Sequence, residues 1–141
     1  YTGPQSNNQA MTATGMFCRQ LDLVPPSDPR MPEGAQALKM RPMSVNNPAY
    51  YYVYYGTLAL YQHQGPVWSE WNDRLKETLP RLQNKNGSDA GSWDKGSGHA
   101  ASGGRIISTT LATLSLEVYY RLLPMYGFRN KEAAPPPKQK L

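Results

Sequence analysis

Apolar residues recur along this chain at intervals of three and four, the period of an α-helix, and hardly anywhere at intervals of two. This spacing predicts about five helices and no sheet. The predicted ranges are 6–21, 33–40, 48–61, 65–82 and 105–123. Proline-containing segments separate several of them, where helix continuation is blocked. We therefore expect an all-α fold.

Each of the first two predicted helices has one apolar face. In the first, the residues spaced three and four apart are Met11, Thr14, Phe17, Cys18 and Leu21. We expect this stripe to be buried, which makes Cys18 a small buried hydrophobic residue. The second helix should turn inward Ala35 and Leu38, together with Met31 just before it.

The tyrosine-rich segment 49–61 could form either a strand or a helix. As a helix it places Tyr50, Tyr54, Leu58 and Tyr61 on one stripe, and its second half, Gly56-Thr57-Leu58-Ala59-Leu60, continues into good helix formers. The helix is therefore the better interpretation. Asn47 is a suitable N-cap, with Pro48 in the first turn, where its missing N–H costs nothing.

The last two predicted helices differ in how much of their surface is apolar. Helix 65–82 opens at Gly65-Pro66 and has a single apolar stripe, formed by Trp68, Trp71, Leu75, Leu79 and Leu82. Helix 105–123 is apolar nearly all round and should lie in the interior. The first, third and fifth helices would thus form an inner layer and the second and fourth an outer one. This alternation is typical of an α/α toroid or solenoid built from helical hairpins.

Length and charge limit the function. The chain has 141 residues, enough for one core, so we expect a single helical domain over residues 1–128. Of the net charge of +5, residues 129–141 contribute +3 (Arg129, Lys131, Lys138 and Lys140 less Glu132), in a tail rich in proline and lysine that we expect to be flexible. The body is nearly neutral and has no basic stripe. We therefore expect no nucleic-acid partner.

Few residues could hold a cofactor or a metal. Cys18 is the single cysteine, which excludes an internal disulfide, and it lies far in sequence from His63 and His99, without the close ligand pairs of a zinc site. We expect no cofactor. The longest apolar tract, 106–118, is interrupted by polar residues and is shorter than the roughly 20 residues of a membrane span. The chain begins at Tyr1, which suggests a processed product, a domain or a fragment, so its compartment stays open.

The segment between the last two helices carries the most specific pattern. It contains Gln83, Gly87, then Gly91-Ser92-Trp93-Asp94, and a helix containing Thr109-Thr110-Leu111-Ala112 follows. These residues resemble the glutamine–tryptophan repeat of the terpenoid cyclase and protein prenyltransferase superfamily, also called squalene cyclase-like. The resemblance covers residues 10–125. Outside the motif, the sequence is similar to uncharacterised bacterial proteins of planctomycete type. It implies a part of an α/α toroid, whose complete ring has about twelve helices.

In that superfamily the glutamine and the tryptophan tie the end of an outer helix to the start of the next inner one. By resemblance, the repeat junction here consists of Gln83, Gly91, Trp93 and Asp94. Trp93 follows Gln83 by ten positions where the family's spacing is six, as though Ser88 to Gly91 were inserted. For Asp94 we expect a cap on the next helix.

The enzymes of the superfamily use an acidic run of the Asp-x-Asp-Asp type or a zinc set, and the chain has neither. Tyr50, Tyr54 and Tyr61 could line a ligand cavity, because tyrosine faces stabilise cations, but core packing is the simpler interpretation. Glu117 should pair with Arg121. We expect a non-catalytic repeat module that binds a protein partner, the rest of its own ring or a hydrophobic small molecule. The alternative is an enzyme fragment whose catalytic residues lie outside this chain.

Overall fold

The computed structural model describes residues 8–125 and is all-helical over that range, as predicted. Its α-helices are α1 (Gln9–Leu21), α2 (Arg30–Lys39), α3 (Tyr50–His63), α4 (Gly65–Leu82) and α5 (Gly104–Arg121). A short 3-10 helix, η1 (Gly98–Gly103), leads into α5. The tyrosine-rich segment is helical, so the strand interpretation is excluded. The proposed tail 129–141 lies outside the described residues.

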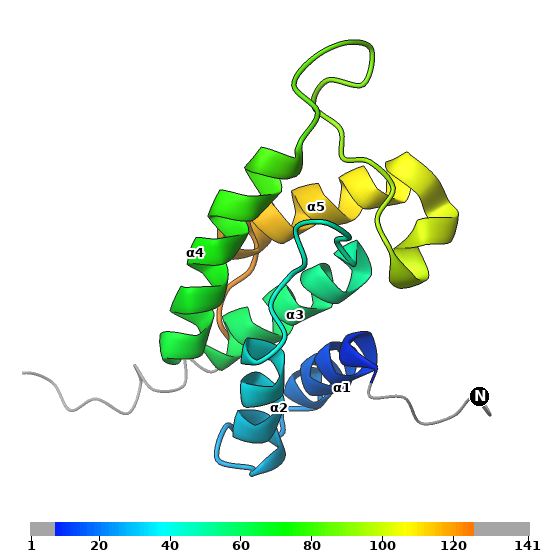
Figure 1. Ribbon diagram of the computed structural model, residues 1–141. Coiled ribbons are helices and arrows are strands. Elements are labelled where there is room, and N and C mark those ends of the chain that lie inside the picture. The colour runs from blue at the N-terminus through cyan, green and yellow to red at the C-terminus, as the bar shows by residue number, and fades with distance from the viewer. Residues whose placement is uncertain (1–7, 126–141) are drawn as a thin grey trace, which may run out of the picture.

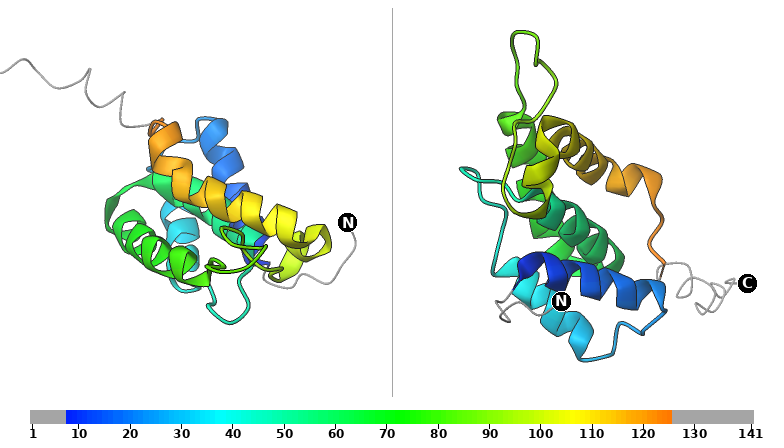
Figure 2. Two further views of the ribbon diagram at one scale, coloured as in Figure 1. Left: turned by 90° about the horizontal axis from the view of Figure 1, so that it is seen from above. Right: turned by 90° about the vertical axis from the view of Figure 1, so that its right-hand side faces the viewer.

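Helices α1, α3 and α5 form a row with α3 in the middle, and all three run in the same direction (Figures 1 and 2). Hydrogen bonds fix this arrangement at both ends. The Gln20 side-chain amide donates to the carbonyl of Ala59 at 2.9 Å, near the ends of α1 and α3. The Tyr61 hydroxyl donates to the carbonyl of Leu122 at 2.7 Å, just past α5. Where α3 begins, the Ser97 N–H donates to the carbonyl of Pro48 at 2.9 Å.

Helices α2 and α4 cover one side of this row. Helix α2 packs against α1 and α3, and α4 packs against α3 and α5. The faces predicted for these two helices are confirmed: α2 buries Met31, Ala35 and Leu38, and α4 buries Trp71, Leu75 and Leu79. The result is a two-layer arrangement, with the odd-numbered helices in one layer and the even-numbered helices in the other. Closure of such layers into a ring stays a prediction.

The buried face predicted for α1 is wrong. Met11 and Leu21 are 56% and 57% exposed, and Cys18 is exposed as well. The buried stripe consists instead of Ala10, Ala13, Met16 and Gln20. Small alanines let α1 approach the crowded surface of α3 closely, and the Gln20 amide satisfies a backbone carbonyl there. Polar and small residues thus occupy the interface that the larger apolar residues were expected to fill.

The interior position predicted for α5 is also wrong. This helix buries only Ser108, Ala112, Ser115 and Val118, while Ile106 and Tyr120 are 79% and 77% exposed. The buried helix is α3, in which ten residues are buried. Its start differs from the prediction, because Pro48 precedes the helix and Ala49 takes the N-cap position without a side-chain hydrogen bond.

Candidate functional site

The residues predicted to form the repeat junction lie together between α4 and α5. Gln83 and Trp93 face each other in an isolated antiparallel bridge. The Asn84 N–H donates to the carbonyl of Ser92, and the Gly91 N–H donates to the carbonyl of Asn84, both at 2.8 Å. The Gln83 side-chain amide donates to the carbonyl of Gly91 at 2.8 Å. The extra residues between Gln83 and Trp93 therefore form a closed, protruding loop, and its base brings the two residues together (Figure 1).

Trp93 connects the end of α4 to α5. Its side chain is 4% exposed, and its indole N–H donates to the carbonyl of Leu79 at 2.7 Å. This carbonyl is one of the last four of α4, which have no partner within the helix. The Trp93 backbone N–H donates to the Thr109 hydroxyl at 3.0 Å. Trp93 is thus a buried link between the two layers. Thr109, which the motif placed in the following helix but which was not predicted to be part of the junction, is a member of it.

Asp94 does not cap α5, contrary to the prediction. Gly103 takes the N-cap position of that helix. The Asp94 carboxylate instead accepts hydrogen bonds from the side chains of Asn84 (3.0 Å) and Arg105 (2.7 Å). Arg105 also forms an ion pair with Asp89 in the protruding loop, and this hydrogen bond raises the pKa of Arg105. Asp94 cannot cap α5 because η1 separates it from the start of that helix. Through Arg105, the two aspartates instead attach the protruding loop to α5.

The three tyrosines proposed as cavity lining are in the helical core or at its border. Tyr50 and Tyr61 are 2% and 7% exposed, and Tyr54 is half-buried. They belong to two separate apolar clusters, Tyr50 to the larger one and Tyr61 and Tyr54 to a smaller one around Leu58. The ring of Tyr61 also meets that of Trp68 edge-on at 5.2 Å. Their surfaces are therefore used mainly for packing between helices.

The buried phenols predict a loss of stability at alkaline pH. Burial, and then the charge of Asp94, raise the pKa of Tyr50 to about 12, and burial also raises the pKa of Tyr52 and Tyr61. A tyrosine in the unfolded chain ionises near pH 10. Above that pH the unfolded state binds fewer protons than the folded state, so the stability present below pH 10 declines as the pH rises towards 12. We expect the urea midpoint to fall between pH 9 and pH 11.5, and Tyr50→Phe to reduce the decline. Equal midpoints at both pH values would contradict this.

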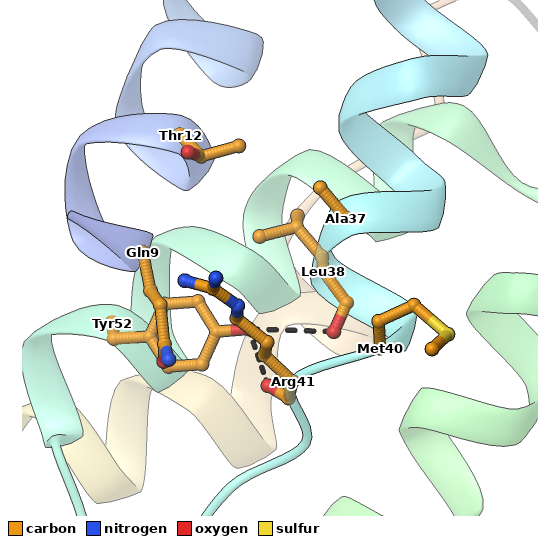
Figure 3. A pocket seen from close by; sticks show the side chains of 7 residues that line it. All are labelled: Gln9, Thr12, Ala37, Leu38, Met40, Arg41 and Tyr52. Atoms are coloured by element: carbon orange, nitrogen blue, oxygen red, sulfur yellow. Dashed lines mark hydrogen bonds between the residues drawn. The ribbon is translucent and has the colours of Figure 1, made fainter. Parts of the chain in front are cut away.

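A cavity of about 230 Å³ lies between the start of α1, the end of α2 and α3 (Figure 3). Seven residues line it: Gln9, Thr12, Ala37, Leu38, Met40, Arg41 and Tyr52. The Tyr52 hydroxyl donates to the carbonyl of Arg41 at 2.6 Å and lies 3.4 Å from that of Leu38. Burial raises the pKa of this phenol, so it stays neutral. The hydroxyl therefore caps the end of α2.

The side of the row turned away from α2 and α4 carries apolar and aromatic residues, and we name it the open face. On α3, Gly56 and Thr57 point towards Trp71 of α4, whose indole N–H donates to the Thr57 hydroxyl at 2.9 Å. At about 100° per residue, Tyr51 and Tyr55 lie on the opposite side of α3, and Tyr54 lies next to that side, towards α5. On each helix of the row, the residues on the side away from α2 and α4 form the open face. They are Met11, Thr14, Cys18 and Leu21 of α1, Tyr51, Tyr54 and Tyr55 of α3, and Ile107, Leu111 and Leu114 of α5.

The centre of the open face is a tyrosine cluster. The ring of Tyr55 lies 4.7 Å from that of Tyr51 and 5.2 Å from that of Tyr54. Burial and the neighbouring phenol of Tyr51 raise the pKa of Tyr55. All three rings are half-buried, and Met11, Leu21 and Ile107, elsewhere on the same face, are exposed. The sequence proposed Tyr54 as a site residue but not Tyr51 and Tyr55, which fall on the adjacent stripe, because only the packing shows which side of α3 is uncovered.

Three candidate metal ligands were considered from the sequence. Cys18 lies on α1, and His63 is the last residue of α3. The side chain of His99 lies outside the description. Over residues 8–125, leaving out the side chains of residues 99 and 100, no three histidine, cysteine or acidic side chains gather closely enough to hold a metal ion. In the same part of the chain, no helix is long and apolar enough to cross a membrane.

Comparisons with known protein families, with curated proteins and with solved structures find no match to this chain.

Proposed function

We propose that this chain is a non-catalytic helical repeat module, of the α/α-toroid type that the squalene cyclase-like superfamily uses, and that it binds a protein partner on its open face. The observation that carries the proposal is the side of the parallel row α1–α3–α5 that α2 and α4 leave uncovered, where residues 122–125 cover only the end near Gln62. A two-layer repeat buries one side of such a row with its outer helices and leaves the other side for binding. Here that side holds a tyrosine cluster bordered by exposed apolar side chains.

The chemistry of the open face favours a protein partner over a small molecule. Tyrosine is enriched in protein interfaces because its ring is large and rigid and its hydroxyl can stay at a polar rim. Methionine, represented here by Met11, adapts to irregular partners. The face is a broad surface over three helices, whereas small molecules are usually enclosed in a pocket. An apolar segment or helix of another protein, or a further part of the same ring, fits it best.

A photo-crosslinking phenylalanine analogue at Tyr54 tests this proposal, because it keeps an aromatic ring at the centre of the open face. The matched control places the same analogue at Lys76, exposed on the outer surface of α4. In cells that express the full protein, we expect one defined cross-linked product from position 54 and none from position 76. Equal labelling from both positions, or no product from either, would count against the proposal. Binding of a long-chain isoprenoid to the purified chain, lost in Tyr54→Asp, would instead support the small-molecule function.

A further inference from the structure

We infer that copies of this chain associate head to tail, with the outer edge of α5 in one copy packed against the outer edge of α1 in the next. The inference rests on the proposed repeat module, but it concerns the two ends of the helix row and not the open face. Each end presents a helix side with exposed residues, although α2 packs beside the α1 end. The charged residues on those two sides are opposite in sign and lie at matching heights along the parallel helix axes.

The α5 edge is the side of that helix opposite α3. Since α5 buries its small-residue stripe against α3, the residues on its other side point away from the row. They are spaced four, three, four and three apart: Ile106, Thr110, Thr113, Glu117 and Tyr120. Ile106 and Tyr120 are the most exposed large apolar residues among the described ones, at 79% and 77%. Arg121 lies beside this stripe, with its guanidinium 3.0 Å from the Glu117 carboxylate.

The α1 edge is the corresponding side of the first helix. Ala13 and Gln20 face α3, so Gly15 and Asp22 point outward, with Met11, at the border with the open face, one turn before Gly15. Arg19 lies at the border between this outward side and α2. Met11, Arg19 and Asp22 are exposed. This edge therefore combines an exposed apolar residue, a position without a side chain and two opposite charges. The α5 edge carries exposed apolar residues and two charges in the reverse order, Glu117 before Arg121.

The hydrogen bonds within the row set the level of each edge. Gln20 reaches Ala59 of α3, and Tyr61 of α3 reaches Leu122 after α5. Residues 19–22 of α1 are therefore level with residues near 118–122 of α5, within about two residues at 1.5 Å of rise each. If α1 of the next copy continues the row in parallel, its Arg19 meets Glu117 of the first copy, and its Asp22 meets Arg121 of the first copy.

Both charge pairs in this register join opposite charges, and Gly15 comes level with Thr113, which allows the two helices to approach closely. A contact between two different edges is heterologous, so it propagates into a ring or an open chain of copies. The charges make the register specific, because a shift of one turn would place like charges together.

Charge reversal tests the inference in the folded chain. We expect the mass of the wild-type chain in analytical ultracentrifugation to rise with protein concentration, and less so at high salt. Glu117→Arg and Arg19→Glu should each weaken the association about tenfold or more, because like charges then meet. A one-to-one mixture of the two variants should recover the wild-type association, because opposite charges meet again at every contact.

The matched control is Glu77→Arg on α4, which removes an ion pair of the same spacing, Glu77–Arg81 at 3.1 Å, from the outer layer. It should leave the association unchanged, and circular dichroism should show that all variants remain helical. A wild-type chain that stays monomeric at high concentration, or a mixture that stays as weak as the single variants, would overturn the inference. Crosslinking from Tyr54 to a different protein would still support the proposed open face in that case.

Discussion

Replacing Trp93 with alanine is expected to lower the free energy of unfolding by about 3–5 kcal/mol, the range for truncating a large buried aromatic side chain. The ring is 4% exposed at the junction between the layers. Its removal also leaves the carbonyl of Leu79 without the indole N–H that it accepts at 2.7 Å. Urea denaturation followed by circular dichroism measures the change.

Two control variants separate these contributions. Trp93→Phe keeps most of the apolar ring but removes the N–H, so it should cost about 1–2 kcal/mol, in the range for an unsatisfied buried carbonyl. Trp68→Ala removes a half-buried tryptophan from the same protein, and we expect a smaller loss than for Trp93→Ala. A loss below about 1 kcal/mol for Trp93→Ala would show that this side chain does not hold the junction together.

Gly96→Ala is expected to destabilise the protein by about 3 kcal/mol, at the upper end of the usual range for overpacking. A Cβ at this position would overlap the carbonyl oxygen of Pro48 and come within 2.8 Å of the Tyr50 ring. The Pro48 carbonyl belongs to the backbone and accepts the Ser97 N–H, so it cannot move aside without loss of that bond. The segment before η1 must therefore separate from the start of α3. Thermal unfolding followed by circular dichroism measures this loss.

The matched variant is Gly15→Ala, which adds the same methyl group within α1. Its Cβ would meet only the Arg19 guanidinium, at an ordinary contact distance of 3.5 Å. In a helix interior, alanine is favoured over glycine by about 0.5–1 kcal/mol, so this variant should be as stable as the wild type or more stable. If both variants had similar effects, the close approach of Gly96 to Pro48 would not be the cause.

The buried faces of α2 and α4 could be predicted from the sequence. Helix α4 begins at Gly65 and buries Trp71, Leu75 and Leu79 as its periodicity indicated. Its stripe is unambiguous because polar residues fill the rest of the surface, including the ion pair of Glu70 and Arg74 at 3.2 Å. The pair of Glu117 and Arg121 was also predicted correctly.

The buried faces of α1 and α5 could not be predicted from hydrophobicity. Both helices pack on α3 through small or polar residues, such as Ala13 and Gln20 of α1 and Ser108 and Ser115 of α5. Serines can be buried there because their hydroxyls have partners, as Ser115 does with the carbonyl of Leu111 at 2.7 Å. The larger apolar residues of the same helices are then left on the surface, which is why they became visible as binding edges only in the structure.

At the junction between α4 and α5, the sequence motif predicted one part of the contacts and the tertiary structure added the rest. The motif indicated that Gln83 and Trp93 belong together, although their separation differs from the family's spacing. Only the structure shows how the added residues fold back, with Asn84 paired to Ser92 and Arg105 holding the loop. Such a contact depends on Arg105, which lies beyond η1 in the chain, so local sequence reasoning could not include it.

The sequence by itself determined the helical class, the position of the helices and the faces of α2 and α4, because these follow from local periodicity and from glycine and proline. The tertiary structure decided which helix is central and which sides of α1 and α5 are covered. That choice depends on how closely two helix surfaces can approach, and close approach favours alanine, serine and glycine, whose placement a hydrophobic pattern does not register. The open face and the two complementary edges of the row are consequences of that choice.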